Sequence, residues 1–137
     1  MKEIAGLVDV VLTTARQLEA RLDGTLRPLG LSLAKVGVLH HLATAQEPIG
    51  LGTLAAHQGC VRSNITQLVD RLEKDGLVRR HDHAGDRRCV HAALTPAGER
   101  AYARAQRAIA EAQRAILGSL GAAEVAQTRH TLERMGG

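Results

Sequence analysis

The chain has 137 residues, a length that suits one compact domain of ordinary size. Hydrophobic residues make up 45% and charged residues 23%, which excludes a disordered chain and favours a soluble globular protein. The net charge of +4 permits a polyanionic partner. Aromatic residues amount to 1%, all of it Tyr102, so stacking of bases on exposed rings is excluded as the main way of holding a ligand.

The sequence contains no segment typical of membrane insertion or secretion. Residues 48–61 form the longest stretch without a charged side chain, and this stretch carries three glycines and polar residues. The first residues lack the apolar region of a signal peptide. The two cysteines, Cys60 and Cys89, have no C-x-x-C spacing, which is atypical of a disulfide scaffold. We therefore expect a cytoplasmic protein without membrane contact, and no motif indicates a cofactor.

The N-terminal part of the chain is predicted to be helical. Apolar residues recur at intervals of three and four from Ile4 to Leu22, and this helix ends near residues 28–30, where proline and glycine stand. Ser32 is a predicted N-cap, because its hydroxyl can accept a free backbone N–H of the next helix. That second helix carries the apolar residues Val36, Val38, Leu39 and Leu42.

Two more helices are predicted in the middle of the chain. A break at residues 46–52 contains a proline and two glycines, and a short helix from Thr53 to Gln58 follows, closed by Gly59. The next helix covers about residues 61–74. Its apolar face consists of Ile65, Leu68, Val69 and Leu72.

The hydrophobic pattern then alternates with a period of two. Residues 77–81 and 88–94 are predicted strands, joined by the polar turn 82–87. In the second strand one face carries Val90, Ala92 and Leu94. The segment 77–94 is therefore predicted to be a two-stranded hairpin.

The C-terminal part returns to helix. Thr95 followed by Pro96 combines a capping hydroxyl with a proline at the first helical position, and a long alanine-rich helix follows. Residues 118–121 interrupt it, and a last helix covers about residues 122–135. The order helix, helix, helix, helix, hairpin, helix, helix predicts a mainly α fold of the winged helix–turn–helix class. The predicted organisation is one domain, 1–137, with a winged-helix region at 32–95 between terminal helices at 1–29 and 96–137.

The position of the basic residues points to DNA. Arg62 opens the predicted recognition helix, and Arg87 with Arg88 lies at the hairpin, so the two elements would straddle a major groove and the adjacent minor groove. Asp70 opposes this interpretation unless it is paired, and Lys74 is a possible partner at helical spacing. The candidate DNA-contacting residues of the helix are Arg62, Ser63, Asn64, Thr66 and Gln67.

Residues 54–95 resemble the MarR family of bacterial winged-helix transcription regulators. The resemblance rests on the segments 54–59, 62–80 and 94–98, and on the wing pattern D-x-R, five residues, L-T, which Asp86, Arg88, Leu94 and Thr95 match. It implies a homodimer that places a recognition helix of each subunit in a major groove of double-stranded DNA. It also implies a minor-groove contact from Arg88 with Arg87, oriented by Asp86. The chain departs from the family pattern at Val61, where the family usually has Ser or Thr before the recognition helix.

The apolar stripe of the first helix agrees with a dimer. A helix that exposed Leu7, Val8, Val11 and Leu18 would be prone to aggregation, and a second chain would bury this stripe. The alternative is that the terminal helices fold back within one subunit.

The signal that such a regulator would sense stays open. The resemblance implies a repressor released by a small-molecule effector bound between the dimerisation and DNA-binding regions, or by an oxidant. Oxidation of Cys60, before the recognition helix, or of Cys89, in the wing, would displace a DNA-contacting element, although free cysteine is commonly a buried apolar residue. A metal site would need three or four convergent ligands; His81, His83 and His91 with Cys89 are candidates, but we expect none. A thiol enzyme built on Cys89 and His91 is a remote alternative, so we expect no enzyme.

Overall fold

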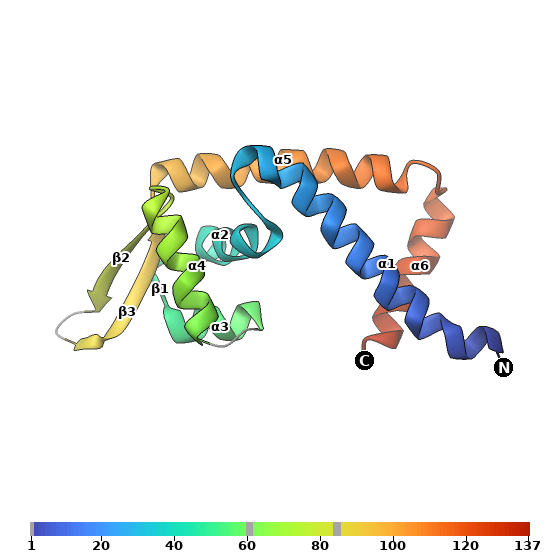
Figure 1. Ribbon diagram of the computed structural model, residues 1–137, viewed down its shortest axis with the longest axis horizontal. Coiled ribbons are helices and arrows are strands. Elements are labelled where there is room, and N and C mark those ends of the chain that lie inside the picture. The colour runs from blue at the N-terminus through green and yellow to red at the C-terminus, as the bar shows by residue number, and fades with distance from the viewer. Residues whose placement is uncertain (1, 60–61, 84–85) are drawn as a thin grey trace.

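In the computed structural model the terminal helices extend away from a winged-helix region (Figure 1). The model describes the backbone of residues 2–59, 62–83 and 86–137, and the side chains of residues 6–59, 64–81 and 90–137. The elements in chain order are α1 (Lys2–Leu26), the short 3-10 helix η1 (Arg27–Leu29), α2 (Leu33–Thr44), β1 (Ile49–Gly50), α3 (Leu51–Gln58), α4 (Arg62–Lys74), β2 (Val78–His83), β3 (Asp86–Leu94), α5 (Pro96–Leu117) and α6 (Ala122–Met135). The predicted succession of helices and hairpin is confirmed.

Both helix starts predicted from capping chemistry are confirmed. The Ser32 hydroxyl accepts a hydrogen bond from the Lys35 backbone N–H at 3.2 Å, at the start of α2. The Thr95 hydroxyl accepts one from the Gly98 N–H at 3.0 Å, at the start of α5. These bonds satisfy backbone donors that the first turn of a helix leaves without a partner.

The sheet has three strands in the order β1-β3-β2, all antiparallel; β2 and β3 form the predicted hairpin, and β1 is a third strand that was not predicted. Ile49 pairs with Ala92 and Gly50 with His91, which adds β1 to the other edge of β3. The break predicted at 46–52 therefore contains a strand, and α3 begins at Leu51, two residues before the predicted start. A strand of two residues is too short to show a periodicity in the sequence, so only its pairing with β3 reveals it.

The wing strands are longer than predicted. β2 extends to His83 instead of ending at residue 81, and β3 begins at Asp86 instead of residue 88. The polar turn predicted at 82–87 is shortened accordingly. Charged and polar residues form these strand ends because cross-strand pairing, rather than hydrophobic alternation, continues the ladder there.

The core lies between α2, α3, α4, the sheet and the first half of α5. It is built from aliphatic residues, among which Leu39, Leu54, Ile65, Leu72 and Ala92 have no exposed surface. Val90 and Leu94 pack against the same cluster, so the predicted common face of Val90, Ala92 and Leu94 is confirmed and is the face that meets the core. This core fixes α4 and the wing relative to each other.

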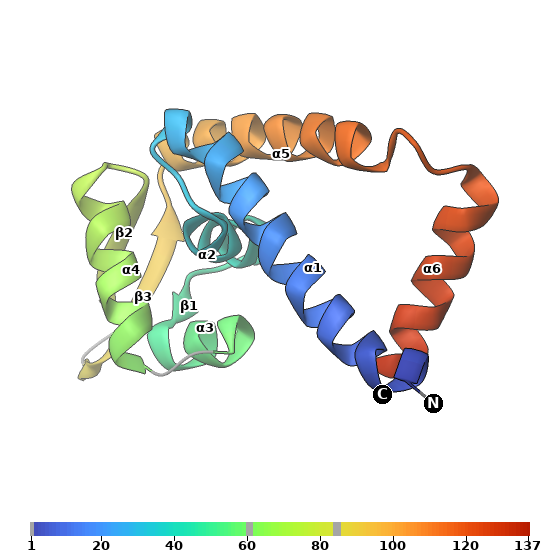
Figure 2. The same cartoon turned by 45° about the vertical axis from the view of Figure 1, so that its right-hand side comes forward.

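The terminal helices form an open frame beside the winged-helix region. α5 runs along one side, α1 descends from it at an angle, and α6 turns back towards the N-terminal end of α1 (Figure 2). Within α6 every residue is exposed except Val125, which is partly so. Large apolar side chains are exposed on these helices and on the connection between α5 and α6: Leu7, Val8, Val10, Leu12, Leu117, Leu120, Leu132 and Met135. In the described part of the chain, no helix has both the length and the apolar character that crossing a membrane requires.

Candidate nucleic-acid interface

The orientation of α4 follows from its buried face. Ile65, Val69 and Leu72 have no exposed surface, so the opposite side of the helix must face solvent. Asn64 and Gln67, two predicted DNA-contacting residues, are exposed, whereas Thr66 is half-buried. An amide side chain can donate and accept at the same time, which is the pattern that adenine presents in the major groove.

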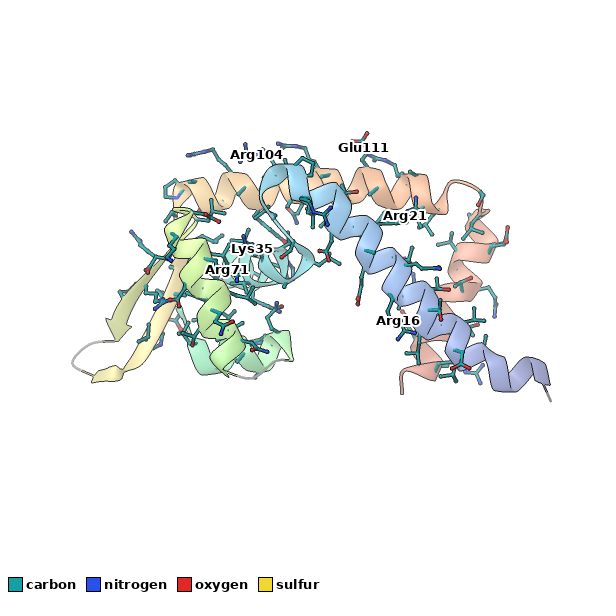
Figure 3. The ribbon with its side chains drawn as sticks, in the orientation of Figure 1. Arg16, Arg21, Lys35, Arg71, Arg104 and Glu111 are labelled. Carbon is teal, nitrogen blue, oxygen red and sulfur yellow. The ribbon has the colours of Figure 1, made fainter. Side chains whose placement is uncertain are left out.

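Arg71 belongs to the same exposed face but was absent from the predicted site. Asn64, Gln67 and Arg71 follow one another at intervals of three and four, and together with Leu68 they line a shallow hollow of about 250 Å³. Figure 3 shows Arg71 on α4, whereas Arg104 lies on the outer side of α5, away from the winged-helix region. The helical spacing from Asn64 is the sequence feature that could have identified Arg71.

The carboxylate of Asp70 is paired, but with a different partner from the predicted one. Its ion pair is with the Arg80 guanidinium on β2, not with Lys74. The Arg80 backbone N–H also donates to Glu73 Oε2 at 3.1 Å. Because side chains alternate along a strand, Arg80 points to α4 while Arg79 lines a different pocket. The pairing neutralises an unfavourable negative charge on the exposed face and links α4 to β2.

The remaining predicted site residues are placed by backbone alone. Arg62 and Ser63 form the first turn of α4, and their side chains lie outside the described residues. Asp86, Arg87, Arg88 and Cys89 lie in the first half of β3, and their side chains are likewise outside the described part. Cys60 and Val61 lie outside the described residues altogether. Their predicted roles stay predictions.

The histidines form contacts between helices. His40 Nδ1 lies 2.6 Å from the Tyr102 hydroxyl on α5, and the His41 ring lies 5.0 Å from that of His57 on α3, so the adjacent histidines face different elements. His81 and His91 are opposite each other in the wing ladder. Among the described residues, no group of three or more His, Cys, Asp or Glu side chains could hold a metal ion.

A pocket of about 410 Å³ lies where α2 meets α5. At one end the Tyr102 hydroxyl accepts a hydrogen bond from Gln106 Nε2 at 2.9 Å and contacts His40. The other lining residues are Leu33, Val36, Gly37, Ile109, Ala110 and Gln113. An apolar wall with a polar group at one end is typical of sites for small amphipathic molecules.

Comparisons with known proteins agree with this architecture. The MarR family model matches residues 31–90. The homoprotocatechuate degradative operon repressor of Escherichia coli is 38% identical over 79 residues, which are 57% of this chain and 53% of that protein. The chain thus spans about half the length of this curated relative.

Two solved structures extend the similarity over nearly the whole chain. The transcriptional regulator MosR of M. tuberculosis, in complex with DNA, is 28% identical with a TM-score of 0.75, covering 95% of this chain and 92% of that chain. CouR from Rhodococcus jostii RHA1, bound to p-coumaroyl-CoA, is 26% identical with a TM-score of 0.77, covering 92% of this chain and 88% of that chain.

The family match begins just before α2 and ends within β3, so it contains the helices and most of the wing that form the candidate interface. The predicted winged-helix class and the predicted resemblance are both confirmed. The chain is therefore similar to the MarR family, whose members are transcription regulators and not enzymes.

Proposed function

We propose that this protein is a dimeric, sequence-specific DNA-binding repressor that releases its operator when it receives a signal. The observation that carries the proposal is the exposed face of α4, where Asn64, Gln67 and Arg71 stand beside a carboxylate neutralised by Arg80. Amide and guanidinium groups on one helical face are the groups that hydrogen-bond base edges and phosphates. The complex of MosR with DNA supports the same use of the fold in this chain.

The proposed contacts divide between two grooves. The helix residues Arg62, Ser63, Asn64, Thr66 and Gln67, with the addition of Arg71, would contact a major groove. Arg88, with Arg87 beside it and Asp86 orienting it, would enter the adjacent minor groove, where the negative potential of A·T-rich DNA attracts arginine.

The exposed apolar side chains of the terminal helices support the homodimer. Leu7, Val8 and Leu12 on α1 are 47%, 56% and 51% exposed, and Leu132 and Met135 on α6 are 46% and 44% exposed. So much apolar surface on these two helices is unusual for a monomer, and a second copy of the chain would bury it. The two recognition helices would then contact half-sites about one helical turn apart.

Selection of bound sequences from random duplex DNA tests the proposal. We expect enrichment of a two-fold-symmetric site and an affinity that falls steeply with salt. Enrichment of no sequence, together with a strictly monomeric protein in solution, would contradict it.

Arginine-to-alanine variants locate the interface. Arg71→Ala should weaken operator binding and lower the salt slope by about one if the side chain contacts a phosphate. Arg88→Ala should weaken binding strongly while leaving the dimer intact. Arg104→Ala removes the same charge from the outer side of α5 and is the matched control, which should bind as the unaltered protein does. If the control loses as much affinity as Arg71→Ala, net charge rather than position explains the binding.

Gln67→Ala tests base reading separately from affinity. We expect it to reduce discrimination between the operator and random DNA by about 1–3 kcal/mol. Equal weakening on both duplexes would show that Gln67 reads no base.

The pocket between α2 and α5 is the proposed effector site, because it joins a helix of the winged-helix region to a helix of the proposed dimer interface. The ligand of CouR, p-coumaroyl-CoA, carries a phenolic acyl group, which supports an effector with an aromatic group. Calorimetric titration with salicylate and 4-hydroxycinnamate tests this, and Tyr102→Phe should weaken any binding by removing the hydroxyl. An oxidant acting on Cys60 or Cys89 is the second candidate signal. Loss of operator binding in peroxide, abolished by the matching Cys→Ser variant, would favour it.

A further inference from the structure

We propose that Gln58 is a positioning residue that holds α3 against α2 and thereby transmits changes at the α2–α5 pocket to the DNA-binding helices. This inference rests on the proposed function, since its consequence is a change in operator affinity. It names the residue through which a change at the pocket would reach the proposed recognition helix.

The Gln58 side chain is bonded to α2. Its Nε2 donates to the Ala34 carbonyl oxygen at 3.0 Å. Its side chain also raises the pKa of His41 on the same helix through a hydrogen bond. The His41 and His57 rings, 5.0 Å apart, form a second contact between the same two helices.

The bonded amide occupies space that only a glycine leaves free. A Cβ atom added to Gly37 would lie 2.4 Å from Gln58 Oε1 and 2.7 Å from Nε2. Both distances are far below ordinary van der Waals contact, so the amide rests directly against the backbone of α2. Any displacement of α2 at Gly37 must therefore move Gln58 or break its hydrogen bonds.

The same stretch of α2 forms the wall of the pocket. Leu33, Val36, Gly37 and His40 line it, so Gly37 lies between the pocket and the Gln58 amide. Gln58 is the last residue of α3, and Gly59 ends the helix in the left-handed conformation with φ 66°. A shift of the end of α3 would therefore move the point from which the chain continues to α4.

The position of α3 does not depend on Gln58 for burial. Leu51, Leu54 and Ala55 pack into the core with at most 5% exposure. Removing the amide should therefore leave α3 folded and change only its placement, which separates a positioning role from a merely structural one.

Gly37→Ala displaces the Gln58 amide without any ligand, because the amide is the movable end of a flexible side chain. We expect the affinity for the selected operator to fall by about three-fold, within the range for residues in direct contact. Gln58→Ala should cost about the same, because both variants remove the same hydrogen bonding between α3 and α2. The double variant should match Gln58→Ala, since the added methyl group then meets no amide. Gly24→Ala on α1 is the control, because no atom lies within 4 Å of its added Cβ, and it should bind as the unaltered protein does.

NMR titration of His41 gives a readout that requires no DNA. The hydrogen bond in which the His41 ring N–H donates to the Gln58 amide oxygen raises the pKa of His41, so Gln58→Ala and Gly37→Ala should both lower this pKa and Gly24→Ala should not. If the unaltered protein binds no duplex, the proposed function fails even though this shift appears. Suppose that the unaltered protein binds the operator. If Gly37→Ala then binds it equally well, or if the fold losses of operator affinity of the two single variants multiply in the double variant, the role of Gln58 is overturned while the proposed function stands.

Discussion

The junction between the wing and α5 should not accept any side chain at Gly98. An added Cβ would lie 2.0 Å from the Leu77 carbonyl oxygen and 3.2 Å from Leu94 Cδ2. The Leu77 oxygen is held in place, because it accepts a hydrogen bond from the Thr95 backbone N–H at 3.1 Å. The Thr95 hydroxyl also donates to the Gly76 carbonyl oxygen at 2.6 Å, so the wing and the helix start are joined on both sides of the contact.

The expected cost of Gly98→Ala follows from this geometry. Ordinary van der Waals contact begins at 3.4 Å, so the backbone at Gly98 and the Leu77 carbonyl must move apart by more than an ångström before the added Cβ fits. Overpacking of a tight site costs about 1–3 kcal/mol, and the upper end applies because the colliding atom is backbone. The greater helix propensity of alanine offsets less than about 1 kcal/mol in a first turn. We expect a net loss of about 2–3 kcal/mol and a midpoint of thermal unfolding about 10 °C lower.

Circular dichroism during urea and thermal unfolding measures this loss. Protein concentration must be the same for all variants, because association shifts the midpoint. Gly24→Ala is the matched control; its added methyl group meets nothing, and the variant should gain about 0.5–1 kcal/mol. A Gly98→Ala variant as stable as the unaltered protein would refute the reasoning, since it would mean that the Leu77 carbonyl moves without cost.

Three further changes test local features. Ser32→Ala removes the cap of α2 and should lower the free energy of unfolding by about 1 kcal/mol in urea. The pKa of His41 is lowered from its ordinary value of 6.5, first by burial and then by the charges of His57 and His40. The unfolded chain therefore binds this proton more readily, so the contribution of His41 to the free energy of unfolding is fully present above pH 6.5 and is lost as the pH falls from there through the lowered pKa. His41→Asn should flatten this part of the curve of unfolding free energy against pH. Arg80→Ala leaves Asp70 unpaired on the α4 face, and operator affinity measured at fixed salt should fall although Arg80 itself need not touch DNA.

The parts of the fold that were predictable depend on neighbours in sequence. The starts of α2 and α5 follow from Ser32 and from Thr95 with Pro96, because a cap acts within three residues of itself. The buried face of α4 follows from the helical spacing of Ile65, Val69 and Leu72, which needs no knowledge of what covers it.

The parts that escaped prediction depend on residues far apart. β1 exists only because Ile49 meets Ala92, and the partner of Asp70 is Arg80 rather than Lys74 because β2 returns beside α4. The contact between Gly37 and Gln58 likewise joins two helices whose separation no spacing reveals.

The sequence by itself therefore determined which segments are helices and strands, and which helix carries the polar face, since hydrogen bonding and hydrophobic period are properties of short stretches. Only the tertiary structure decided which charges neutralise each other, that β1 joins the sheet and how α2 contacts α3. These are outcomes of packing, and packing places atoms next to each other without regard to their distance along the chain.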